Sequence, residues 1–150
     1  MALPRWFSPV ALLVVMLGGA LGVAARAALV VPLSAGTHPL VVPAVTLAIN
    51  LLGSLLLGLV VGALGDRRPL LRLFLGTGIL GGFTTYSAFA VHVVSTSSDA
   101  PIVGLALAAV SVLGGVVAAT AGLMLGGRLP GSPGTEEDPA GSPLSPEDAE

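Results

Sequence analysis

The middle of the third hydrophobic segment reads Gly81-Gly82-Phe83-Thr84-Thr85-Tyr86-Ser87. The motif lies inside residues 73–98, which contain no acidic residue, lysine or arginine. Glycines, hydroxyls and an aromatic ring therefore occur where lipid-facing side chains are expected. At this depth a backbone polar group costs several kcal/mol unless protein, water or an ion satisfies it. The motif predicts a binding site or a conduction path inside a membrane.

The composition assigns the chain to a bilayer and excludes several function classes. Hydrophobic residues make up 54% of the 150 residues and charged residues 9%, whereas a soluble domain carries about 25% charged residues. The chain has no cysteine, which excludes disulfides and thiolate metal sites. No hydrophobic segment contains an acid, and no serine, histidine and acid are spaced as a catalytic triad. We therefore expect neither an enzyme, nor a transporter that uses an intramembrane carboxylate, nor a nucleic-acid partner.

Apolar windows of about 20 residues predict an all-α integral membrane protein with four transmembrane helices. The third helix is expected to break near its middle, at the motif quoted above. Residues 1–128 would form the transmembrane domain, and residues 129–150, rich in Pro, Gly, Ser and acid, a disordered acidic tail. The predicted spans lie at about residues 9–30, 43–64, 70–94 and 101–126.

The first span has an alternative interpretation as a secretory signal peptide. Arg5 precedes an apolar run, and Ala25-Arg26-Ala27 has the form of a cleavage site. The apolar run is long for a signal peptide, and its glycines are typical of helix packing, as are three later pairs of small residues. These pairs are Gly58 with Gly62, Gly78 with Gly82, and Gly122 with Gly126. Ordinary glycine content of membrane helices would explain them equally well.

The arginines predict the orientation of the chain. With four spans, both termini and the short turn before the third span share one side of the membrane. That side collects five arginines, and the opposite side has at most Arg26. By the positive-inside rule we expect cytoplasmic termini. The five are Arg5, Arg67, Arg68, Arg72 and Arg128.

Asn50 is the strongly polar residue of the second span, and Thr46 and Ser54 lie on its face of the helix. An amide at this depth either joins helices by hydrogen bonds or lines a polar path. In the fourth span Ser111 offers a hydroxyl, although such groups commonly bond to their own helix. Arg26 is close enough to the end of its span to reach the interface, and His92 is expected to be interfacial.

The third-span motif could supply two kinds of ligand. Adjacent glycines and threonines weaken helical hydrogen bonding, and carbonyls freed at a break could hold a hard cation. Farther along, Tyr86, Ser87 and Phe89 offer electropositive ring edges and a hydroxyl donor, which suit a weakly held anion. The alternatives are a kink filled by neighbouring helices and an aromatic pair that only packs.

Three motifs, in order and spacing, resemble those of the Fluc/CrcB family of small fluoride channels. The first is the glycine-rich stretch 18–26, which ends in Arg26, and the second is Thr46 and Asn50 ahead of Gly53-Ser54. The most specific is residues 77–89, which are close to the signature G-x-x-G-G-x-T-T-F-S-T-F. The resemblance covers about residues 9–126.

The resemblance implies an antiparallel, dual-topology-type dimer with two fluoride pathways and a structural sodium ion at its centre. The sodium-binding carbonyls would be those of Gly81 and Thr84, and Arg26 would match a structural arginine of the first span. Fluoride released in the cytoplasm would leave passively through the channel. The implied fluoride pathway consists of Asn50, Tyr86, Ser87, Phe89 and, with a weaker match, Ser111.

The chain departs from the family pattern at Tyr86, where the signature has phenylalanine, and in the fourth span, which has no tyrosine. The arginine bias also favours one orientation, whereas an antiparallel homodimer needs both. We therefore hypothesise a heterodimer with an inverted paralogue. Two other functions stay open at this point: a non-conducting membrane scaffold and a small-molecule exporter.

Overall fold

The computed structural model describes residues 8–34 and 37–129, which contain helices and no strand. Four helical stretches in this part are long and apolar enough to cross a membrane, as the sequence predicts. The predicted acidic tail, apart from residue 129, lies outside the described residues. The elements are α1 (Pro9–Val30), the 3₁₀ turn η1 (Val31–Leu33), α2 (Val41–Leu64), α3 (Pro69–Arg72), the π-helical segment η2 (Leu73–Leu80), α4 (Gly81–Phe83), α5 (Tyr86–Asp99) and α6 (Pro101–Gly127).

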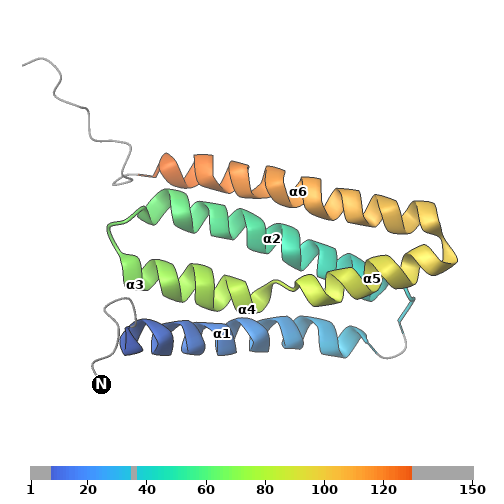
Figure 1. Cartoon of the computed structure of the whole chain (residues 1–150), viewed down its shortest axis with the longest axis horizontal. Coiled ribbons are helices and arrows are strands. Elements are labelled where there is room, and N and C mark those ends of the chain that lie inside the picture. The colour runs from blue at the N-terminus through green and yellow to red at the C-terminus, as the bar shows by residue number, and fades with distance from the viewer. Residues whose placement is uncertain (1–7, 35–36, 130–150) are drawn as a thin grey trace, which may run out of the picture.

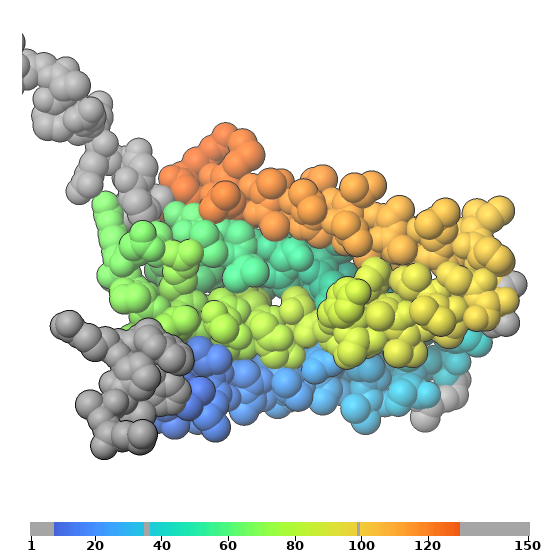
Figure 2. Space-filling model, in the orientation of Figure 1, coloured from blue at the N-terminus to red at the C-terminus, as the bar shows by residue number. Residues whose placement is uncertain are grey.

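The third span runs between α1 on one side and α2 with α6 on the other (Figure 1). Its first half, η2 and α4, packs on α1, and its second half, α5, packs on α6 and α2. The space-filling view shows the atoms of the third span between those of α1 and α6 along the length of the bundle (Figure 2). The α2–α3 turn lies at the same end of the bundle as the start of α1 and the end of α6 (Figure 1).

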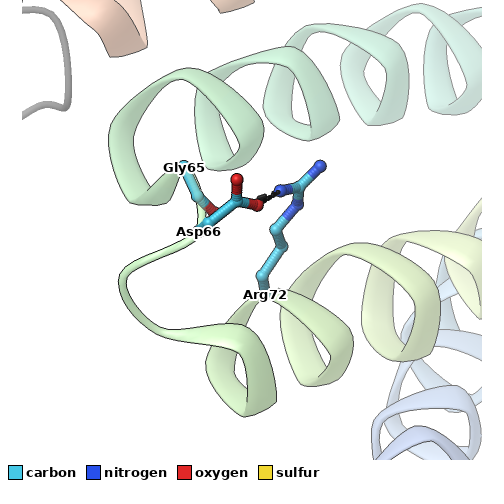
Figure 3. A network of polar contacts seen from close by, with 3 residues as sticks. All are labelled: Gly65, Asp66 and Arg72. Atoms are coloured by element: carbon cyan, nitrogen blue, oxygen red, sulfur yellow. Dashed lines mark hydrogen bonds and ion pairs between the residues drawn. The ribbon is translucent and has the colours of Figure 1, made fainter.

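A short turn reverses the chain between α2 and α3. Gly65 ends α2 with a φ of 49°, a conformation that favours glycine. Arg72 then donates a hydrogen bond to the Gly65 carbonyl at 3.1 Å and forms an ion pair with Asp66 at 2.9 Å (Figure 3). Pro69 opens α3 at a first-turn position that needs no N–H donor. The turn therefore fixes α2 and the third span as antiparallel neighbours.

Glycines bring the helix backbones into direct contact. A Cβ atom at Gly58 would overlap the carbonyl oxygen of Ala119, and one at Gly122 would overlap that of Leu55. These positions join α2 to α6 and, with Gly62 and Gly126, form what we call the glycine seam. The other predicted pair, Gly78 and Gly82, likewise meets the backbone of α1. The predicted pairs are therefore specific packing contacts, because no larger residue fits without moving a helix.

Candidate functional site

The backbone of the third span is extended at two residues between α4 and α5. Thr84 has φ −76° and ψ 160°, and Thr85 has φ −149° and ψ 114°. Threonine suits this place because its hydroxyl can replace a helical partner. The Thr85 hydroxyl accepts a hydrogen bond from the N–H of Ala88 at 3.2 Å and so caps α5. The Thr84 hydroxyl donates to the Leu80 carbonyl at 2.9 Å.

Asn50 of α2 pairs with the backbone of this extended segment. Its Oδ1 accepts from the N–H of Thr85 at 2.9 Å, and its Nδ2 donates to the carbonyl of Thr85 at 3.1 Å. The amide thus satisfies both backbone groups of a residue that has left the helix. Because a carboxamide has two N–H donors, one donor of Asn50 stays available after these bonds.

A cavity of about 340 Å³ adjoins the extended segment, and we call it the break cavity. Its polar side chains come from α2, α6 and both sides of the break. The hydroxyl oxygen of Ser111 is buried and has no hydrogen-bond partner among the described residues. The lining residues are Asn50, Gly53, Ser54, Leu57, Gly76, Leu80, Gly81, Thr84, Thr85, Tyr86, Phe89, Ser111 and Val112.

Two aromatic rings of α5 line the same cavity. The ring centroids of Tyr86 and Phe89 are 5.9 Å apart, and the ring planes are tilted by 50°. This arrangement is within the favourable range for an aromatic pair. The Tyr86 side chain is nevertheless 81% exposed, so it lies at the surface of the four-helix bundle rather than in its interior.

A second cavity, of about 270 Å³, lies toward the C-terminal end of α1, and we call it the Arg26 cavity. The Nε of Arg26 is buried without a partner among the described residues. Across the cavity, the His92 Nε2 is 3.4 Å from the hydroxyl of Thr46, a residue only 3% exposed. Thr85, the residue that Asn50 holds, lines both cavities.

The two cavities differ in charge: Arg26 lines the second cavity, whereas no permanently charged residue lines the break cavity. Their only ionisable lining residues are Arg26, His92 and Tyr86, and no acid lines either one. The described residues contain no group of three or more His, Cys, Asp or Glu that could hold a metal ion. A cation here would therefore depend on carbonyl and hydroxyl oxygens.

Comparison with known proteins identifies the family. The model of the family described as CrcB-like protein, Camphor Resistance (CrcB), matches residues 13–123. The chain belongs to this family. Among its relatives, the fluoride-specific ion channel FluC 2 of Bacillus subtilis is 40% identical over 119 residues, which are 78% of this chain and 88% of the relative. The fluoride-specific ion channel FluC of Deinococcus radiodurans is 43% identical over 140 residues, which are 86% of this chain and all of the relative.

Membership agrees with the four membrane-crossing helices, so the chain is a multi-pass membrane protein. The relatives are named as channels, and the family is not one of enzymes. A third relative, FluC 1 of Rhodococcus jostii, is 45% identical over 115 residues and bears the same channel name.

The structure gathers most of the predicted site residues around the break cavity. Both predicted cation ligands and four of the five predicted pathway residues line it. Ser87 does not, although its hydroxyl is 3.3 Å from that of Thr85. Arg26 lies in the second cavity instead.

Sequence reasoning missed two features of the site. Thr85 was not singled out, although it pairs with Asn50 and lines both cavities, and the repeated threonine was the available signal. His92 was assigned no partner, although it is half-buried and its Nε2 lies 3.4 Å from the Thr46 hydroxyl. Nothing in the sequence indicated the contact between His92 and Thr46, because it depends on how α2 and α5 cross.

Proposed function

We propose that the chain is one subunit of a fluoride-specific channel that lets fluoride leave the cytoplasm passively. The observation that carries this proposal is the break cavity, where donors without a fixed charge collect at the middle of a membrane-crossing bundle. In acidic surroundings hydrofluoric acid enters a cell and releases fluoride inside. A channel of this kind would lower the resulting toxicity without an energy source. The channel names of the relatives support the same ion.

The neutral donors of the break cavity suit a small, strongly hydrated anion. The free N–H of Asn50 and the unpartnered hydroxyl of Ser111 can replace part of the water around fluoride. The positive ring edges of Tyr86 and Phe89 add weak attraction. Because none of these groups carries a full charge, fluoride would be held weakly enough to leave. Ser87 would extend the path at the start of α5.

A sodium ion fits the carbonyl groups near the break. The chain leaves the helix after Phe83, and carbonyls at a helix end lack helical partners. Gly81 and Thr84 line the cavity, and Gly81 has no side chain to shield its oxygen. Carbonyl oxygens are ligands that hard cations accept. Such an ion would supply a fixed positive potential near the anion path. Because one chain offers only two of these carbonyls, a second subunit would have to complete the coordination of the ion.

An antiparallel dimer would cover the exposed side of the site. Tyr86 is 81% exposed. The polar groups of the break cavity would be costly to expose to lipid, because lipid offers them no hydrogen bonds. Five of the six arginines favour one orientation with cytoplasmic termini. We therefore infer an inverted paralogue as the partner, and Arg26 would serve each subunit as a structural arginine.

Fluoride efflux from proteoliposomes, followed with a fluoride electrode, tests the channel. We expect Asn50→Asp and Phe89→Ile to abolish most of the flux, because the first places a negative charge in the path and the second removes a ring. Phe74→Ile is the matched control, since Phe74 of η2 lines neither cavity. Flux that survives both site variants unchanged would refute the pathway.

The same assay separates the other functions and the two kinds of dimer. Efficient fluoride efflux from liposomes that contain this chain alone would exclude an obligatory heterodimer. No flux with any inverted paralogue would favour a non-conducting scaffold. Saturable movement of an organic substrate, coupled to an ion gradient, would favour an exporter.

A further inference from the structure

His92 is a titratable residue that the proposed pathway does not use. It faces the Arg26 cavity from α5, and its Nε2 lies 3.4 Å from the Thr46 hydroxyl. Histidine is the side chain whose ordinary pKa, about 6.5, lies closest to physiological pH. The cavity therefore contains one permanent cation, Arg26, and one group that becomes a cation when it takes up a proton.

We propose that His92 is a positioning residue that acts through Thr46 and makes anion entry into the Arg26 cavity respond to pH. The proposal rests on the proposed channel function. In the neutral ring with its proton on Nδ1, Nε2 accepts the Thr46 hydroxyl hydrogen. When Nε2 takes a proton from water, it becomes a donor to the Thr46 oxygen. The Thr46 hydrogen is then free to turn toward an anion in the cavity.

No acidic residue faces His92 from the helices packed against it, so the positive charge gained on protonation is not neutralised there. No residue of α2, η2, α4 or α6 is titratable, so Arg26 is the charged group that faces the ring from another element. On α5 itself, Tyr86 lines the break cavity, and Asp99 ends the helix about 10 Å farther along the axis by helical rise. A proton on His92 therefore adds positive charge to a cavity that is already positive, which an anion would offset.

The positions of His92 and Thr46 place this pair close to the proposed fluoride path. Thr46 lies one helical turn before Asn50 on α2, and Thr85 lines both cavities. An anion attracted by Arg26 and Thr46 would thus be next to the residue that Asn50 holds. Protonation of His92 would raise the occupancy of this entrance without changing the donors of the break cavity.

Fluoride flux measured at pH 4.5 and 7.5 tests the proposal, since these values lie about two units below and one unit above the ordinary histidine pKa. We expect wild-type flux to be at least about fivefold greater at the lower pH, the lower end of typical coupling between two sites. His92→Gln and Thr46→Val should each abolish this ratio, the latter with the histidine intact. The leak of hydrofluoric acid is subtracted from liposomes without protein. His38→Gln is the matched control, because His38 is exposed in the first loop and should keep the wild-type ratio.

A wild-type ratio that persists in His92→Gln or Thr46→Val, or is absent from the wild type, would overturn the proposal. No flux at any pH, with or without an inverted paralogue, would refute the channel function instead, and a binding measurement then decides about His92. The chain has two histidines, so nitrogen NMR of labelled protein resolves both, and His38→Gln assigns them. At pH 6.5, sodium fluoride should shift the His92 signals toward the imidazolium form, whereas sodium gluconate should not. Signals that respond equally to both salts would exclude the coupling.

Discussion

The glycine seam and the extended segment at Thr84 and Thr85 use small residues in opposite ways. In the seam, glycine lets the backbones of α2 and α6 touch and leaves no room for a side chain. At the break, a methyl group on Gly81 would meet only the Gly76 carbonyl oxygen at 3.8 Å, an ordinary contact. The comparison teaches that glycine content alone does not separate packing from function in a membrane helix. What a methyl group would meet does separate them.

The two regions also differ in how their polar groups are satisfied. Helices in the seam keep their own hydrogen bonds, so close van der Waals contact is the main interaction between them. At the break the helix gives up its hydrogen bonds, and the side chain of Asn50 on another helix replaces two of them. The seam should therefore be sensitive to added volume, and the break to loss of hydrogen bonds.

The largest expected effect on folding is that of Gly122→Ala in the seam. The new methyl group would overlap the Leu55 carbonyl oxygen, which is backbone and cannot move without shifting α2. We expect a loss of about 3 kcal/mol, the upper end for overpacking. The loss of stability is measured by thermal melting in detergent, with size-exclusion chromatography as the readout of folded protein. The control is Gly127→Ala on the same helix, which has no neighbour within 4 Å. Equal melting of the two variants would show that the seam does not limit stability.

Asn50→Ala should produce the next largest effect, and it should affect folding and flux together. Both the N–H and the carbonyl of Thr85 lose their partner. We expect about 2 kcal/mol of lost stability, because unsatisfied buried groups cost about 1–3 kcal/mol each and water entering the cavity replaces part of the loss. Melting and electrode-monitored efflux are measured on the same preparation. A variant with wild-type stability and no flux would mean that Asn50 contacts the ion but does not support the break.

The sequence was sufficient to predict the four spans and six of the residues that line the break cavity. Long apolar windows fix the spans, and residues such as Asn50 and Thr84 are conspicuous because polar groups are costly in a bilayer. It could not predict that Asn50 pairs with Thr85, or that His92 reaches Thr46. These contacts depend on the crossing of helices that are distant in sequence. The separate position of Arg26, in a second cavity, has the same origin.

Ser111→Ala, unlike the two variants above, should not lower the stability of the protein. The Ser111 hydroxyl is buried without a partner in the described part of the chain, so its removal relieves a desolvation cost. We expect an unchanged or slightly higher melting temperature, together with reduced fluoride flux. Thr120→Ala is the control, because the Thr120 hydroxyl bonds carbonyls of its own helix and lines neither cavity. A clear loss of stability in Ser111→Ala would indicate that the hydroxyl has a structural partner and no free donor.

The smallest expected effect is that of Gly81→Ala. This variant tests whether glycine near the break, unlike glycine in the seam, can be replaced without a clash. The methyl group has room, and alanine favours helix by up to about 1 kcal/mol over glycine, so we expect stability that is unchanged or raised by at most about 1 kcal/mol. The carbonyl proposed to hold sodium is retained, so flux should persist. Gly82→Ala, one residue away, provides the reference, because its methyl group would overlap the Gly19 carbonyl oxygen of α1. Equal destabilisation of the two variants would mean that the break needs glycine for its conformation rather than for space, and the distinction between the two regions would then fail.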